Sequence, residues 1–121
     1  MVYVGSSLQV IDNSGARLVE CIKVLGNGRT VAVAGSTIIV AVKRVNPKKR
    51  IKKGEIYRAV LVATKKSSPR SNGFQVTFGA NCAVVVSNKD VPLGTRLLGP
   101  VMLDVRSRGL FKVVSMATLS I

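Results

Sequence analysis

The side chains of this chain that can do chemistry are mostly cationic. Its 121 residues include 19 Lys and Arg, five acids and no histidine, which gives a formal net charge of +14. The absence of histidine removes the commonest general base and the hydrolase triads built on it. The acids form no D-x-D or E-x-x-E pair for metal or acid/base chemistry, being scattered as Asp12, Glu20, Glu55, Asp90 and Asp104. We therefore predict a protein that is not an enzyme and that has no metal or cofactor site.

A cationic run from Lys43 to Lys53 carries the strongest functional signal. It reads K-R-V-N-P-K-K-R-I-K-K, with seven Lys or Arg residues and no acid, and a second acid-free loop, T-K-K-S-S-P-R-S-N-G, begins at Thr64. Solvated charged faces usually mix both signs, so we favour polyanion binding over a merely solvated face. The predicted phosphate-binding residues of the two loops are Lys43, Arg44, Lys48, Lys49, Arg50, Lys52, Lys53, Lys65, Lys66 and Arg70.

The aromatic residues help to define the kind of nucleic acid. The chain has five, Tyr3, Tyr57, Phe74, Phe78 and Phe111, and their apolar neighbours predict packing in the core. Single strands are usually held by stacking on exposed rings. We therefore expect recognition of folded RNA or duplex through backbone and shape. A free-standing single-strand-binding barrel is the alternative, and it would need exposed rings.

Short segments rich in β-branched residues recur between turn sequences and predict a mostly β protein, a small antiparallel barrel. Continuous apolar runs at Ile38–Val42 and Val84–Val86 predict strands buried on both faces. Near the carboxyl end, Asp104–Arg108 could form one or two helical turns, followed by an apolar segment from Leu110 to Leu119. The predicted strands are Ser7–Ile11, Arg17–Leu25, Thr37–Val45, Glu55–Thr64, Phe74–Phe78 and Cys82–Ser87.

Size and composition bound the remaining possibilities. Length predicts one domain over residues 1–121, and 47% hydrophobic residues argue against disorder. The longest uncharged apolar stretch, Val31–Val42, is too short to cross a membrane and is interpreted as a strand. Cys21 and Cys82 have apolar neighbours typical of buried thiols in a reducing compartment. Gly26-Asn27-Gly28 is interpreted as a hairpin turn, and the amino end shows no export or transit leader.

Three motifs carry a resemblance to a known family. They are D-N-S-G-A-R at Asp12–Arg17, C-I-K-V-L-G at Cys21–Gly26 and G-T-R-x-x-G-P-V at Gly94–Val101. The spacing of A-V-L-V at Ala59–Val62, followed by Asn72, Gly73, Phe78, Asn81, Val84 and Val85, fits the same pattern. Over nearly its whole length the chain resembles the large-subunit ribosomal protein L-fourteen family, of the bacterial or organellar type.

The resemblance implies a structural role in the large ribosomal subunit. It implies a five-stranded β-barrel with short helical additions, bound to large-subunit rRNA and to neighbouring large-subunit proteins, and part of an intersubunit bridge to small-subunit rRNA. Thr95, Arg96 and Lys112 match family positions that dock a ribosome-silencing factor, and with Arg106 and Arg108 they form the expected partner or bridge surface. No membrane partner is implied.

The turn after the first predicted strand looks like an rRNA-facing element. Asn13, Ser14, Gly15 and Arg17 form it, although a purely structural turn explains the first three nearly as well. The chain departs from the family pattern at Arg44, where an acid is common, and at Leu103 and Asp104, where an Arg-Glu pair is usual. This divergence favours a mitochondrial ribosome, with the bacterial cytoplasm as the alternative.

Overall fold

A computed structural model describes residues 2–25, 30–48, 51–65, 68–69, 75–76, 80–87, 91–94 and 97. This part of the chain is built from strands and contains no helix. Within it, therefore, no helix has the length and apolar composition to cross a membrane. The strands are β1 (Val2–Tyr3), β2 (Ser7–Val10), β3 (Ala16–Val24), β4 (Val31–Ala32), β5 (Thr37–Val45), β6 (Ile56–Ala63), β7 (Ser68–Pro69), β8 (Gln75–Val76) and β9 (Cys82–Val86).

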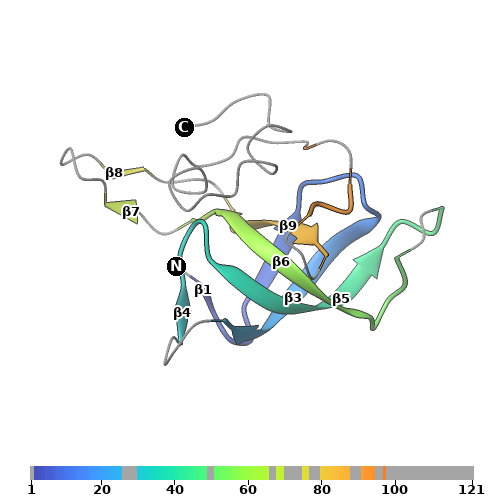
Figure 1. Ribbon diagram of the computed structural model, residues 1–121, viewed down its shortest axis with the longest axis horizontal. Coiled ribbons are helices and arrows are strands. Elements are labelled where there is room, and N and C mark those ends of the chain that lie inside the picture. Colours follow the sequence, from blue (N-terminus) through green and yellow to red (C-terminus); the bar gives the residue numbers. More distant parts are fainter. Residues whose placement is uncertain are drawn as a thin grey trace.

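Five of these strands close into a barrel in the order β2-β3-β5-β6-β9, which confirms the predicted mostly β barrel (Figure 1). Four neighbouring pairs are antiparallel, and β2 and β9 are parallel. The parallel pair has a geometric cause. When successive barrel strands alternate in direction and their number is odd, the first and the last run the same way and must meet as a parallel pair.

The long predicted strands are confirmed to within one residue at each end for β2, β3, β5, β6 and β9. The single strand predicted from Val31 to Val42 is wrong, because the chain turns between β4 and β5. The Ser36 hydroxyl accepts a hydrogen bond from the Val33 backbone N–H at 3.1 Å. Gly35 adopts φ +91°, in the left-handed region that favours glycine. An apolar run with a Gly-Ser pair inside it is thus two strands.

Two apolar clusters lie on opposite faces of the barrel wall. The inner cluster includes Leu8, Val40, Leu61 and Val85, all fully buried. The outer cluster lies over β6 and β9 and is formed by Val60, Val62, Val84, Val86 and Leu97. Burying such side chains typically stabilises a fold by about 1.5–3 kcal/mol each.

A strand is buried on both faces only where the outer cluster covers it. β9 alternates between the inner and outer clusters, so the prediction for Val84–Val86 is confirmed. The same prediction for Ile38–Val42 is wrong, since Ile39 and Ala41 are only half-buried on the outer face of β5. The outer cluster covers β6 and β9 and does not extend over β5.

The cysteines and aromatic residues follow the predictions in part. Cys21 is buried as predicted, whereas Cys82 is half-buried, and both are free thiols whose pKa is raised by burial. Tyr57 packs against the inner cluster. The prediction of core packing is wrong for Tyr3, which is 51% exposed because β1 lies outside the barrel and buries Val2 instead. Phe74, Phe78, Phe111, the Gly26–Gly28 turn and the C-terminal segments Asp104–Arg108 and Leu110–Leu119 lie outside the described residues.

The barrel closes at a short seam of backbone pairs that one carboxylate extends. β2 and β9 share the residue pairs Gln9 with Cys82 and Val10 with Ala83. One residue past β2, the Ile11 N–H still donates to the Ala83 carbonyl at 3.2 Å. Beyond that point, Asp12 Oδ2 accepts the Val85 N–H at 3.1 Å. The Asp12 side chain therefore continues the hydrogen bonding of the seam where the backbone of β2 diverges.

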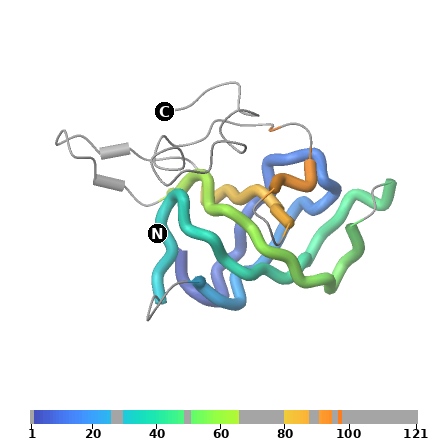
Figure 2. Tube along the Cα trace, in the orientation of Figure 1, coloured from blue at the N-terminus to red at the C-terminus, as the bar shows by residue number. Residues whose placement is uncertain are grey.

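The same carboxylate shapes the turn that follows. Asp12 Oδ1 accepts the Ser14 N–H at 3.1 Å and the Ser14 hydroxyl at 2.5 Å. Asp12 lies in this turn and is only 4% exposed. Figure 2 shows this turn between β2 and β3 beside the segment that contains residues 91–94, in agreement with the bridge between Asp12 and Leu97.

The ionisation of Asp12 should make stability depend on pH. Burial disfavours the carboxylate and raises its pKa, and the bonds from Ser14 and Val85 offset this only in part. The folded state then binds the proton more tightly than the unfolded chain, whose Asp pKa is about 3.9. This contribution is full below that value and is lost as pH rises through the folded pKa. We expect the wild-type advantage over Asp12→Asn in unfolding free energy to shrink from about pH 4 towards neutrality.

Urea unfolding of both proteins across this range measures that difference. The other acids contribute equally to the two proteins, so their titration cancels in the comparison. An advantage that grows with pH would show that the hydrogen bonds outweigh burial at Asp12.

Candidate nucleic-acid interface

Strand pairing brings most of the described cationic side chains to one end of the barrel. The start of β3 meets the end of β5 at Ala16 and Val45. β6 begins beside them, at Ile56 opposite Ala41. This end is the tip at which β5 runs into β6 in Figure 1. We call it the cationic end, formed by the exposed side chains of Arg17, Lys43, Arg44, Lys48, Lys52 and Lys53.

The predicted cationic run leaves and re-enters the barrel through paired backbone. Gly54 N–H donates to the Val42 carbonyl at 2.9 Å, and Val42 N–H donates to the Glu55 carbonyl at 2.9 Å. Just past β5, Asn46 Oδ1 accepts the Lys48 N–H at 3.1 Å, in the manner of an Asx turn. The run is therefore held at its root by hydrogen bonds that leave the side chains of Lys48, Lys52 and Lys53 exposed.

One apolar side chain, Ile51, anchors the second half of the run to the barrel. Ile51 is 6% exposed and joins the inner cluster, although it lies among cations in the sequence. Next to it, Glu55 Oε1 accepts the Lys52 N–H at 2.8 Å, and Glu55 Oε2 accepts the Tyr57 hydroxyl. These contacts fix the backbone from which Lys52 and Lys53 project. Ordering the backbone before binding lowers the entropy lost when a ligand is bound.

Two acids lie within this end of the molecule, although the run itself has none. Lys43 Nζ lies 3.6 Å from Glu20 Oε2, across from β5 on β3. Both groups are well exposed, so this pair contributes at most about 1 kcal/mol. The other acid is Glu55, whose pKa is lowered chiefly by the hydrogen bond from Tyr57. Sequence reasoning missed both pairings; the Lys43–Glu20 pair depends on the register of β3 and β5, whereas the Glu55–Tyr57 bond joins residues two apart in the chain.

The predicted rRNA-facing turn lies directly beside the run. Asn46 N–H donates to the Gly15 carbonyl at 2.7 Å, which joins the two predicted binding segments. Ser14 bonds to buried Asp12, which supports the structural interpretation of that residue. Asn13 and Arg17 instead line a shallow depression together with Asn46. The structure thus brings Asn13 and Arg17 to the cationic end and gives Ser14 a role in shaping the turn.

Lys65, the described cationic residue of the second predicted loop, is separated from the cationic end. Lys65 is exposed just past the end of β6, and its N–H donates to Asn81 Oδ1 at 2.8 Å. The eight residues of β6 lie between it and the cationic end. That strand spans roughly 25 Å at about 3.3 Å per residue. Figure 1 accordingly shows β7 and β8 on the side away from the tip of β5.

Several predicted site residues lie outside the described residues, and they remain predictions: Lys49, Arg50, Lys66, Arg70, Thr95, Arg96, Arg106, Arg108 and Lys112. Within the described ranges, no three His, Cys, Asp or Glu side chains gather in a way that could hold a metal ion.

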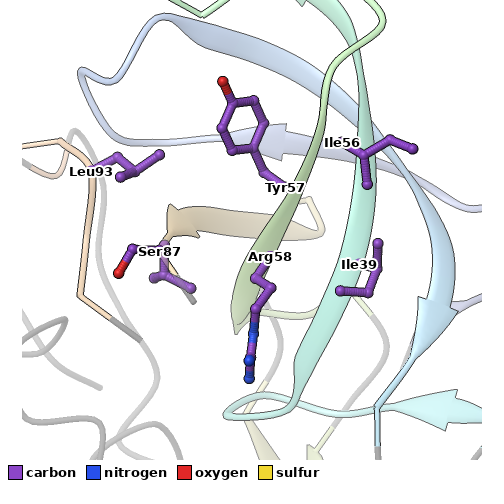
Figure 3. Close-up of a pocket in the computed structure, with 7 residues that line it drawn as sticks. Ile39, Ile56, Tyr57, Arg58, Ser87 and Leu93 are labelled. Carbon is purple, nitrogen blue, oxygen red and sulfur yellow. The ribbon is translucent and has the colours of Figure 1, made fainter. Parts of the chain in front are cut away.

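A second surface of different chemistry lies on the outer wall of β5, β6 and β9. It is a groove lined by Ile39, Ile56, Tyr57, Arg58, Val86, Ser87 and Leu93. Figure 3 shows Ile39 and Ile56 on one side of Arg58, with Ser87 and Leu93 on the other. Ile56 is 64% exposed and Leu93 is 44% exposed, so the groove presents apolar area to solvent. Sequence reasoning missed this groove, because both residues lie in segments of ordinary strand and turn composition.

Together these features define a small closed β-barrel that presents a backbone-fixed cationic end. A sequence model of the family described as ribosomal protein L14p/L23e matches residues 1–121, the whole chain, so the chain belongs to this family. The family is one of structural constituents of the ribosome, in the large subunit, where the environment consists of rRNA and other ribosomal proteins.

The bond between Glu55 and Tyr57 offers a spectroscopic test of the root of the run. The Glu55 carboxylate accepts a hydrogen bond from the Tyr57 hydroxyl. This bond stabilises the neutral phenol and therefore raises the pKa of Tyr57. We expect Glu55→Ala to lower the Tyr57 pKa towards about 10. Absorbance titration at alkaline pH in a Tyr3→Phe background isolates this ring, and circular dichroism verifies that the fold persists. An unchanged pKa in Glu55→Ala would mean that the two side chains are not bonded in solution.

Proposed function

We propose that this protein binds large-subunit rRNA through its cationic end. The observation that carries the proposal is the convergence of six exposed Lys and Arg side chains, from β3 and from both sides of the hairpin between β5 and β6, on backbone held by hydrogen bonds. Such a surface neutralises RNA phosphates and releases their counterions. The fixed backbone suits a folded RNA of defined shape, since phosphate contacts position a protein without reading sequence.

The alternative of a free single-strand-binding barrel is less favoured by the described residues. Of the aromatic side chains in the described residues, Tyr3 is the exposed one, and it lies on β1, which pairs with β4 outside the barrel. β4 leads into the start of β5, whereas the cationic end is at the other end of that strand. The exposed ring and the cationic end therefore lie at opposite ends of the barrel. Single-strand binders combine stacking rings with cationic groups in one groove.

The family membership supports finer proposals. We infer one domain over residues 1–121, contacts with neighbouring large-subunit proteins and a bridge to small-subunit rRNA. Docking of a silencing factor at Thr95, Arg96 and Lys112 rests on the motif resemblance described above. The sequence departures at Arg44, Leu103 and Asp104 favour a mitochondrial ribosome over a bacterial one.

Removing three exposed lysines of the cationic end tests the rRNA proposal. We expect Lys48→Ala, Lys52→Ala and Lys53→Ala together to weaken binding to large-subunit rRNA and to reduce the slope of log affinity against log salt by about 2 to 3. All three side chains are exposed, so unfolding free energy should hardly change. Filter binding at several salt concentrations gives the slope.

Lys23→Ala serves as a control, because Lys23 is exposed near the far end of β3. It should leave the slope unchanged. A triple variant with the wild-type slope would show that these lysines contact no phosphates.

Sedimentation of a tagged copy in its own cells tests assembly and compartment. We expect it to migrate with large subunits in sucrose gradients after washing at high salt, because an integral component makes many contacts at once. Fractionation of the same cells should place these subunits in mitochondria. Recovery with cytoplasmic ribosomes would refute the mitochondrial assignment alone, whereas slow migration without rRNA would refute the rRNA proposal.

A further inference from the structure

A depression beside the cationic end has the donors of an anion site. It is lined by Val10, Asp12, Asn13, Gly15, Ala16, Arg17 and Asn46. Its four polar side chains come from three segments: Asp12 and Asn13 from the turn after β2, Arg17 from the start of β3, and Asn46 from just past β5. The depression therefore exists only because the barrel brings these three segments together.

The walls of the depression are fixed from behind. One wall is tied to the other by the Asn46 N–H, which donates to the Gly15 carbonyl at 2.7 Å. Behind the turn, Gly94 packs so closely that an added Cβ would lie 2.7 Å from Asn13 Oδ1 and 3.2 Å from Ser14 N. A side chain at residue 94 would thus displace the Asn13 amide. The glycine keeps that amide at the border of the depression.

The charge of the depression is set by Arg17. Asp12 also lines it, but this carboxylate is 4% exposed and both of its oxygens accept hydrogen bonds from inside the protein, from Ser14 and Val85. The Arg17 guanidinium is exposed, and within the described residues no ion pair or hydrogen bond engages it. Asn46 Oδ1 is occupied by Lys48 N–H, which leaves its amide N–H groups as donors.

We propose that this depression is an anchoring site for one RNA backbone phosphate, held by the planar fork of Arg17 and by the Asn46 amide. The inference rests on the proposed rRNA binding. It adds one contact that depends on geometry, next to the exposed lysines of the cationic end. Guanidinium binds phosphate oxygens in a bidentate way, whereas an ammonium acts as a point charge. Arg17 thereby fixes the register of the RNA on the barrel, and the lysines supply most of the charge.

Replacing arginine by lysine separates geometry from charge. We expect Arg17→Lys to weaken binding to large-subunit rRNA by about 5- to 10-fold, with the salt slope unchanged because the net charge is conserved. Lys23→Arg is the control, since it exchanges ammonium and guanidinium at constant charge at an exposed position near the far end of β3, outside both the cationic end and the depression. That variant should bind within about twofold of wild type.

Nuclear magnetic resonance with inorganic phosphate tests the site without RNA. Titration should shift the Asn46 side-chain amide signals in the wild type and not in Arg17→Lys. Asn46→Asp keeps the acceptor for Lys48 N–H but removes the amide donors, so it should lose rRNA affinity as well. Thr30→Asp adds the same charge at an exposed position beside β4 and should bind as the wild type does.

The outcomes separate this inference from the proposed function. Equal affinities of Arg17→Lys and Lys23→Arg, with wild-type rRNA binding intact, would overturn the anchoring site alone. Inorganic phosphate shifts without an effect of Arg17→Lys on rRNA binding would mean a site for free phosphate and would also overturn it. A wild-type protein that fails to bind rRNA would refute the proposed function and this inference together.

Discussion

The hydrogen bonding of the Asp12 carboxylate is the constraint on which the rest of the structure depends. Five alternating strands can close only through a parallel pair, and the pair β2 and β9 spans just two residues on each strand. Asp12 extends that seam through Val85 N–H and at the same time bonds Ser14 in the following turn. One side chain therefore contributes both to barrel closure and to turn geometry, at the cost of burying a carboxylate.

The cationic end is connected to this seam through the turn after β2. The turn is joined to the lysine-rich run by the bond between Gly15 and Asn46, and Ile51 ties the same run to the inner cluster. Like charges at this density repel one another, and the acids Glu20 and Glu55 lie where they offset that repulsion at the root. A base held by hydrogen bonds, with exposed cationic side chains, would lower the entropy lost on binding a phosphate.

Local signals in the sequence predicted much of this, and register explains what they could not. β-branched runs between turn residues located the five barrel strands, and the acid-free run located the cationic end. The burial of Ile51 could not be read from K-K-R-I-K-K, because an isolated apolar residue among cations has no periodicity to indicate its direction. The Glu20 to Lys43 contact depends on the pairing of β3 with β5, which contains several register shifts. The depression of Arg17 and Asn46 likewise requires the three-dimensional barrel.

Strand β6 places two chemically different surfaces next to each other. Glu55 fixes the lysine run, and the next residue, Ile56, is 64% exposed at the border of the apolar groove. The groove follows the outer wall of the barrel, where the outer cluster leaves β5 uncovered. RNA phosphates are attracted to cationic side chains, whereas an apolar surface is stabilised when a partner covers it and excludes water. A ligand of one surface thus has little attraction for the other, and the barrel can present both without competition between them.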